Sequence, residues 1–369
     1  MSMWGFSFKV FTEKVNITDA AYMISICLTS SQACCKACVV LYKKSDIENL
    51  LNELASIWRT SHLTEQQMTT RKKQIKTLKR FLFVFYWNYM LGIVVDFSGP
   101  LFVVIGRRFI LKEHCTMKLP FQSALPYDVS DNWFSYLVTY AFQTFIMLHL
   151  VYSLMNLEFL MITFCANLGI EFSLLQQDLE SVSSFTATGE QNDLIFNKMK
   201  PIKNIVRRHQ TLISKDRELR IHTELRGRKP LQKYPQLDHA DGMSGWKEVQ
   251  LITAKGLQVA RGAAETIYYY LAVVGISLPM YLLCYYGEFL RNESLGIADA
   301  AYNNLWYREC VPYQKMIILL VLRAQRPCCL TAWGQVPVTL NMFTKVMSTT
   351  YSYFSVATSV YSGDDDSTD

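Results

Sequence analysis

Charged residues are scarce in this chain of 369 residues: 18% are Asp, Glu, Lys or Arg, and the mean hydropathy is +0.10. A soluble globular protein normally has about a quarter of its residues charged. The shortage is concentrated in long apolar runs, since residues 266–287 carry no charge and residues 81–105 carry only Asp96. About 20 apolar residues cross the roughly 30 Å hydrocarbon core of a bilayer. The composition therefore excludes a disordered chain, argues against a soluble one, and predicts an all-α, polytopic helical membrane protein.

Motifs of catalysis and metal binding are also absent from the sequence. The chain has no phosphate-binding loop, nucleophile elbow, kinase signature or HExxH, and its six His are scattered. Cys35 and Cys38 have CxxC spacing, with Cys34 beside them, but no second ligand pair is nearby, so we expect packing thiols rather than a zinc or redox site. We predict no catalytic residue, no metal and no cofactor, and we expect no enzyme.

Five segments are candidate membrane spans. In chain order they are 17–42, 81–105, 133–168, 266–287 and 336–362. The third has 36 residues, about 54 Å of helix, so one of its ends should project beyond the lipid. The last has Lys345 as its only charge but many Ser and Thr, which suits a helix that packs against others or faces water.

The connecting loops predict the orientation in the membrane. Residues 43–80 hold nine Lys or Arg, residues 106–132 hold four, and residues 169–265 hold fifteen. An excess of Lys and Arg marks cytoplasmic loops. We therefore expect 43–80 and 169–265 in the cytoplasm and 106–132 outside a plasma membrane that the chain crosses several times. The net charge of +6 is then a sign of topology rather than of nucleic-acid binding. Since the chain opens with no basic leader before an apolar core, insertion should use the first internal span.

Two observations bear on function inside the spans. Of the ionisable residues inside the spans, the functional candidates are Asp96, His149 and Glu158. The last two are nine residues apart and occupy opposite helix faces, so a shared proton-relay site is disfavoured. Aromatic residues are dense in the same spans. A cavity lined by aromatics and a few hydroxyls would suit a small lipophilic ligand.

The C-terminal third resembles a known family. It contains CYYGEFLRNES at 284–294, AAY at 300–302, LWY at 305–307, RAQRP at 323–327 and FTKVMSTTYSYF at 343–354. This ordered series resembles the insect odorant receptors. Weaker similarity comes from LPF at 119–121, LPYD at 125–128, GIEF at 169–172 and His209.

The resemblance implies a function and a set of sites. Family members are seven-span subunits that form tetrameric, odorant-gated, non-selective cation channels around a shared co-receptor, each with a C-terminal pore helix. Residues 288–335 would be a cytoplasmic anchor region where subunits meet, and 363–369 an external acidic tail. The subunit-interface residues would be Tyr302, Trp306 and Tyr307, although an ordinary amphipathic surface helix is the competing interpretation. The pore would be lined by Ser352, Ser355 and Thr358, with Val356 or Val360 as a hydrophobic constriction.

The ligand would be a small volatile organic molecule bound near the outer half of the spans. By position, the candidate contacts are Tyr22, Phe97, Phe134, Tyr136, Tyr140 and Tyr268. Two alternatives remain open: a gustatory receptor of the same superfamily, and a secondary transporter, which would need internal repeats that the sequence does not show.

The family pattern fails in two places. Five spans are predicted instead of seven, and about 16 residues precede 17–42 where the family's first span should be. The family's fifth span should lie near 214–250, yet that stretch holds eight Lys or Arg and six Asp or Glu. Without one more crossing, 288–335 would lie outside the cell, where the Asn292-Glu-Ser294 sequon could carry a glycan. We therefore expect an incomplete or non-functional receptor as one possibility.

Overall fold

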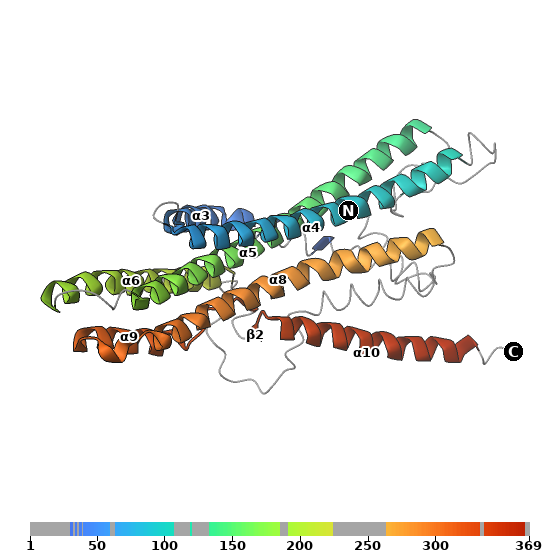
Figure 1. Cartoon of the computed structure of the whole chain (residues 1–369). Helices are drawn as coiled ribbons and strands as arrows, with labels where there is room; N and C mark the ends of the chain where they lie inside the picture. Colours follow the sequence, from blue (N-terminus) through green and yellow to red (C-terminus); the bar gives the residue numbers. More distant parts are fainter. Residues whose placement is uncertain are drawn as a thin grey trace.

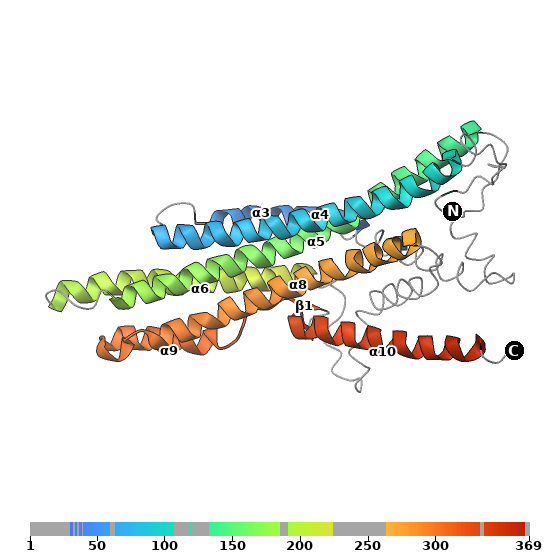
Figure 2. The same cartoon turned by 45° about the vertical axis from the view of Figure 1, so that its right-hand side comes forward.

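The structure is a computed structural model that describes residues 30–31, 34, 37–38, 40–59, 63–106, 119, 133–184, 191–223, 263–332 and 336–365, some of them by backbone alone. Its helices are α3 (Lys44–Ile57), α4 (Glu65–Ile105), α5 (Trp133–Ser184), α6 (Gln191–Thr223), α8 (Ala263–Asn303), the 3₁₀ turn η3 (Trp306–Arg308), α9 (Val311–Ala324) and α10 (Leu340–Asp365). The short strands β1 (Thr331–Ala332) and β2 (Val336–Pro337) pair antiparallel. The helices form an elongated bundle in which α10 lies on the far side of α8 from α4 and α5 (Figures 1 and 2).

Three helices in the described part of the chain are long and apolar enough to cross a membrane. These segments are Glu65–Gly99 in α4, Met155–Val182 in α5, and Val273–Arg308, which begins in α8. The predicted class, an all-α polytopic membrane protein, is confirmed. Most of the first predicted span, 17–42, lies outside the described residues.

The predicted spans are parts of longer helices. The 81–105 span forms the second half of α4, while α5 runs 16 residues past 168 and α8 runs 16 residues past 287. Good helix formers such as Leu, Gln and Glu follow the apolar stretches of α5 and α8, so the helical hydrogen bonding continues where the apolar run ends. The predicted span 336–362 begins as a strand, and its helix starts at Leu340.

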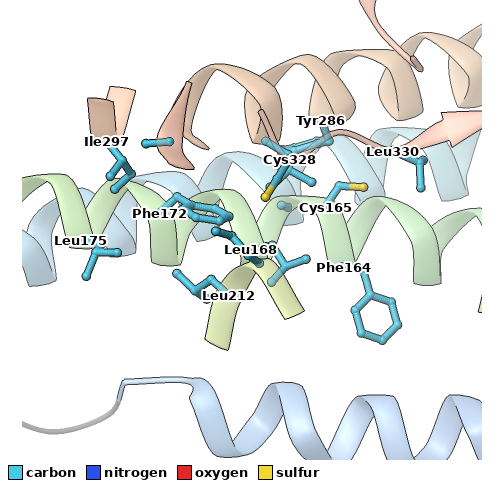
Figure 3. Close-up of a cluster of buried hydrophobic side chains, with 14 of the residues drawn as sticks. Phe164, Cys165, Leu168, Phe172, Leu175, Leu212, Tyr286, Ile297, Cys328 and Leu330 are labelled. Atoms are coloured by element: carbon cyan, nitrogen blue, oxygen red, sulfur yellow. The ribbon is translucent and has the colours of Figure 1, made fainter. Parts of the chain in front are cut away.

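The core surrounds the C-terminal half of α5. Every residue from 164 to 175 is buried, which requires neighbours on all sides of that helix. Leu212 of α6, Tyr286 and Ile297 of α8, and Leu330 belong to the same buried cluster as Phe172 of α5 (Figure 3). Residues 155–184 of α5 are therefore a central helix on which α4, α6 and α8 pack, and α9 packs in turn on α8 and α6.

Two glycines permit the closest approaches in this core. A Cβ at Gly169 of α5 would lie 2.5 Å from the Phe289 ring of α8, and one at Gly287 would overlap the carbonyl oxygen of Val338. The Val338 N–H donates to the Leu330 carbonyl (2.8 Å), which fixes the chain that leads into α10. Phe343 then packs edge-on against Tyr281 of α8, with ring centroids 5.5 Å apart. Gly287 thus sets where α10 joins the bundle.

Candidate functional site

An aromatic cluster joins α4 to the N-terminal half of α5. We define the aromatic cluster as Phe97, Val104, Trp133, Tyr136 and Tyr140. Tyr136 is fully buried, and its ring lies 5.7 Å from that of Trp133 and 5.6 Å from that of Tyr140, measured between centroids. The Tyr140 hydroxyl donates to the backbone carbonyl of Phe97, which connects the two helices. The cluster is therefore an apolar contact between α4 and α5 that contains two buried phenolic side chains.

Helical spacing explains this arrangement. Residues 133, 136 and 140 recur at i, i+3 and i+7 and share one face of α5, while 97 and 104 share one face of α4. Phe134 lies on the other side of α5 and is 75% exposed. The structure thus unites three predicted ligand residues, Phe97, Tyr136 and Tyr140, and separates Phe134 from them. Tyr22 lies outside the described residues, and Tyr268 is on α8 at a position where the structure describes the backbone alone.

Buried polar groups lie between α4, α5 and α8. The Asn88 Oδ1 of α4 is buried, has no hydrogen-bond partner among the described residues, and lies 3.5 Å from the position of a Cβ at Gly275 of α8. Glu158 of α5 is only 8% exposed, whereas His149 of the same helix is exposed. The predicted separation of His149 from Glu158 is confirmed. Asn88 was missed because an uncharged side chain in an apolar run gives no signal of burial.

The predicted pore residues are on the C-terminal half of α10. Ser352 and Ser355 are exposed in the single chain, and the Ser352 hydroxyl donates to the Ser348 carbonyl (3.0 Å). The side chains of Val356, Thr358 and Val360 lie outside the described part of the structure. Because the exposed hydroxyl already donates within its own helix, the Ser352 oxygen remains available as an acceptor.

The predicted subunit-interface residues differ in their burial. Tyr302 and Tyr307 are 69% and 58% exposed, whereas Trp306 packs against the main core. α9 is apolar on two faces. Its inward face is buried and consists of Tyr313, Ile317, Leu320 and Ala324. Its outward face is exposed and carries Val311, Ile318, Leu319 and Leu322 around the single charge of Lys315.

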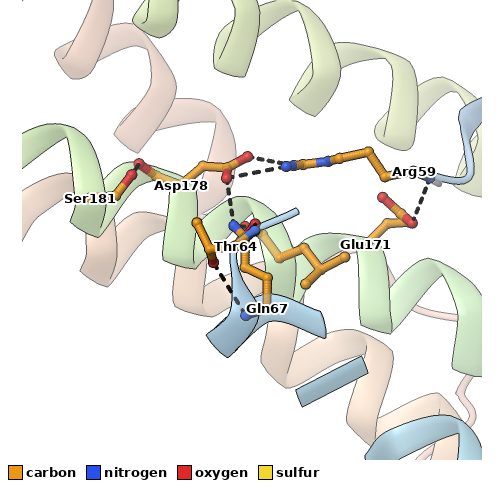
Figure 4. A network of polar contacts seen from close by, with 7 residues as sticks. Arg59, Thr64, Gln67, Glu171, Asp178 and Ser181 are labelled. Atoms are coloured by element: carbon orange, nitrogen blue, oxygen red, sulfur yellow. Dashed lines mark hydrogen bonds and ion pairs between the residues drawn. The ribbon is translucent and has the colours of Figure 1, made fainter. Parts of the chain in front are cut away.

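A polar network fastens the start of α4 to α5 (Figure 4). The Arg59 guanidinium forms a two-pronged ion pair with Asp178, with Nη1 to Oδ1 at 3.2 Å, and Gln67 Nε2 donates to the same carboxylate at 2.6 Å. Thr64 and Gln67 exchange backbone-to-side-chain hydrogen bonds of 3.1 and 3.3 Å, which is a capping box for α4. The Thr-x-x-Gln spacing could have been found in the sequence, but a contact across 119 residues could not.

His209 of α6 lies in the core. The imidazole is 3% exposed and meets the Phe172 ring edge-on, with centroids 6.2 Å apart. Burial, and then the positive charge of Arg323, lower the pKa of His209 from 6.5 to about 4. His209 is therefore neutral at physiological pH and acts as a packing residue.

The described residues contain no site for metal or thiol chemistry. No group of three His, Cys, Asp or Glu there could hold a metal ion. Cys34 and Cys38 are exposed free thiols, so the expectation that they pack inside the chain was wrong for these two. An exposed apolar helix face in a membrane protein contacts lipid, where Cys is simply a small hydrophobic residue.

The long apolar helices define a multi-pass helical membrane protein, and comparison with known proteins gives the family. The family model 7tm Odorant receptor matches residues 16–226 and 252–351. The chain therefore belongs to the odorant receptor family, whose members are receptors rather than enzymes. The gap in the match, 227–251, falls almost wholly within the charged stretch 214–250 that disagrees with the family pattern.

Relatives and a solved structure agree with this assignment. Odorant receptor 67c of Drosophila melanogaster is 33% identical over 106 residues, 28% of this chain and 26% of that protein. Odorant receptor 85b of the same species is 21% identical over 331 residues, 87% of this chain and 77% of that protein. The insect olfactory receptor OR5 from Machilis hrabei in complex with eugenol superposes with a TM-score of 0.74 at 16% identity, covering 94% of this chain and 83% of that one. The fold is thus that of an insect olfactory receptor.

Proposed function

We propose that this chain is the odorant-recognising subunit of a ligand-gated, non-selective cation channel that assembles as a hetero-tetramer with a co-receptor. It would bind small volatile ligands through the aromatic cluster, meet its partners through the anchor region 288–335, and contribute α10 to the pore. The observation that carries the proposal is the second apolar face of α9.

An ordinary amphipathic surface helix would present polar residues to water. α9 instead exposes Ile318, Leu319 and Leu322, at 45%, 66% and 58%. Tyr302 and Tyr307, also exposed, belong to the same anchor region. Exposed apolar surface of this kind marks a contact with another protein or with a membrane. A partner subunit seated on α9 would cover it, which favours the interface over the surface-helix interpretation.

The exposed face of α10 supports the pore assignment. A helix that carries Ser352 and Ser355 toward the outside of a single chain suits contact with water or with other helices. Four such helices around an axis would place these hydroxyls toward the ions. Val356 and Val360 would form the narrow hydrophobic part, and Thr358 would add a further hydroxyl to the lining.

The aromatic cluster supports the ligand assignment. Phe97, Tyr136 and Tyr140 offer apolar burial with phenolic hydroxyls, which suits an aromatic odorant with one polar group. Eugenol, bound by the Machilis receptor, has this chemistry. Ligand selection would then depend on shape more than on specific hydrogen bonds.

Co-expression with an odorant co-receptor tests the proposal. We expect odorant-evoked cation current only when both subunits are present. Leu319→Gln with Leu322→Gln should abolish co-assembly and current, while Lys44→Gln on α3, an exposed charged position outside the anchor region, should leave both intact. Current without the co-receptor, or substrate flux without channel behaviour as in a transporter, would contradict the proposal.

A further inference from the structure

A group of exposed basic residues lies on α4 directly before its apolar run. Lys72, Lys73, Lys76, Lys79 and Arg80 are all exposed, and the uncharged stretch of α4 begins at Phe81. We call these five residues the basic stripe. Neither the odorant-binding nor the channel function proposed above uses them.

Helical geometry places the basic stripe on one side of α4. At 3.6 residues per turn, positions 72, 73, 76, 79 and 80 fall within an arc of about 120°. Leu78, which is 6% exposed, points the opposite way into the core. The five charges therefore form a surface, and the packing of α4 on the rest of the bundle fixes the direction in which it faces.

The neighbouring Arg71 differs from the basic stripe, because its side chain does not face outward. Arg71 turns inward, where it donates to the Arg59 carbonyl and lies over the Trp58 ring at 4.8 Å. The basic stripe makes no ion pair among the described residues, and the nearest acidic residue earlier in the helix is Glu65, about two turns from Lys72. Its charge is therefore not neutralised by its own helix.

The basic stripe lies along α4 at the depth expected for lipid headgroups. A rise of 1.5 Å per residue puts Arg80 about 2 Å, Lys76 about 8 Å and Lys72 about 14 Å from the start of the apolar run. This range covers the headgroup layer and one Debye length of the charged surface. The excess of Lys and Arg in 43–80 predicts that this end of α4 is cytoplasmic, where membrane leaflets carry anionic lipids.

We propose that the basic stripe binds the headgroups of anionic phospholipids in the cytoplasmic leaflet. The contact would hold α4 at a fixed depth. Because the stripe is on a rigid helix, a headgroup with several phosphates should bind more tightly than one with a single phosphate. Each Lys or Arg near such a surface contributes about a factor of five in binding.

The test uses the full-length chain purified in neutral detergent and titrated with fluorescent phosphatidylinositol bisphosphate, phosphatidylserine or phosphatidylcholine. The variant is Lys72→Gln with Lys76→Gln and Lys79→Gln. The matched control is Lys200→Gln with Lys203→Gln and Arg207→Gln, which removes three exposed charges from one face of α6. All six side chains are exposed, so thermal unfolding of both variants should match that of the unaltered chain.

We expect the stripe variant to lose roughly 100-fold in affinity for the phosphoinositide, and the α6 control to lose less than about threefold. Phosphatidylcholine binding should not change, and higher salt should weaken the anionic contact. Equal losses of affinity in both variants would mean that binding depends only on the net charge of the chain, which would overturn the proposal. So would equally tight binding of soluble inositol phosphate, which would indicate a phosphate site instead of a membrane contact.

Discussion

The two ends of the bundle differ in how much of each helix the chain itself covers. At the packed end, residues 164–175 of α5 are buried without a break. At the open end, where α4 meets residues 133–154 of α5, the exposed side chains include Phe102, Phe134, Phe142 and Phe145. Both ends are strongly apolar. Apolar side chains in this protein therefore lie in two environments, the protein core at one end and a surface open to lipid at the other.

The largest expected effect is on the free energy of unfolding, and it is tested by one Phe→Ala substitution at each end of the bundle. Phe172→Ala at the packed end should lower the free energy of unfolding by about 3–5 kcal/mol, because Phe172 is fully buried and its loss leaves a cavity. Phe102→Ala at the open end, where the side chain is 71% exposed, should change it by less than about 1 kcal/mol. Thermal unfolding in detergent, followed by tryptophan fluorescence, measures both. Similar losses for the two variants would remove the distinction between the ends.

The second expected effect is a pH dependence of the free energy of unfolding, which arises from His209 at the packed end. The pKa of His209 is about 4 in the folded chain and about 6.5 when exposed, so the unfolded chain binds its proton more readily. The stability due to neutral His209 is complete above about pH 6.5 and falls as the pH drops toward 4, by on the order of 3 kcal/mol. His209→Gln should flatten this part of the curve of unfolding free energy against pH. An unchanged slope in the variant would show that His209 titrates normally.

The third expected effect, a smaller loss of stability, concerns the polar network at the start of α4. Asp178→Asn should cost about 2 kcal/mol, because it weakens a partly buried pair with Arg59 and a hydrogen bond from Gln67. The exposed pair of Lys44 and Glu48 on α3 is the control, and Glu48→Gln should cost less than about 0.5 kcal/mol. Chemical denaturation compares the two. If both cost the same, the network does not stabilise the start of α4.

The smallest effect concerns ligand recognition at the open end. Tyr140→Phe removes the hydroxyl that joins α5 to the Phe97 carbonyl, so the odorant concentration for half-maximal current should change by about fivefold. Phe134→Leu, on the exposed face of the same helix, should change it by less than about twofold. Eugenol and other aromatic odorants, applied to cells that also express the co-receptor, provide the readout. A larger effect at Phe134 would move the ligand site to the other face of α5.

The helices were easier to predict from sequence than the site. The runs 81–105 and 266–287 were recognisable because apolar stretches of that length with at most one charge are rare outside membranes. Their continuation into longer helices was missed, since polar residues can stay helical once packing holds them, as Gln176 does by donating to the Glu293 carbonyl at 2.6 Å. The ion pair of Arg59 with Asp178 was beyond reach because its partners are 119 residues apart.

The class and the family follow from the chain alone, because charge scarcity, apolar run length and ordered motifs are sequence properties. Which face of each helix is covered depends on how the helices pack. Phe134 and Tyr136 are two residues apart and equally plausible by composition, yet one is exposed and the other fully buried. Hydrophobicity cannot separate them, because lipid is as apolar as a protein core, and only the packing of α4 against α5 tells the two faces apart.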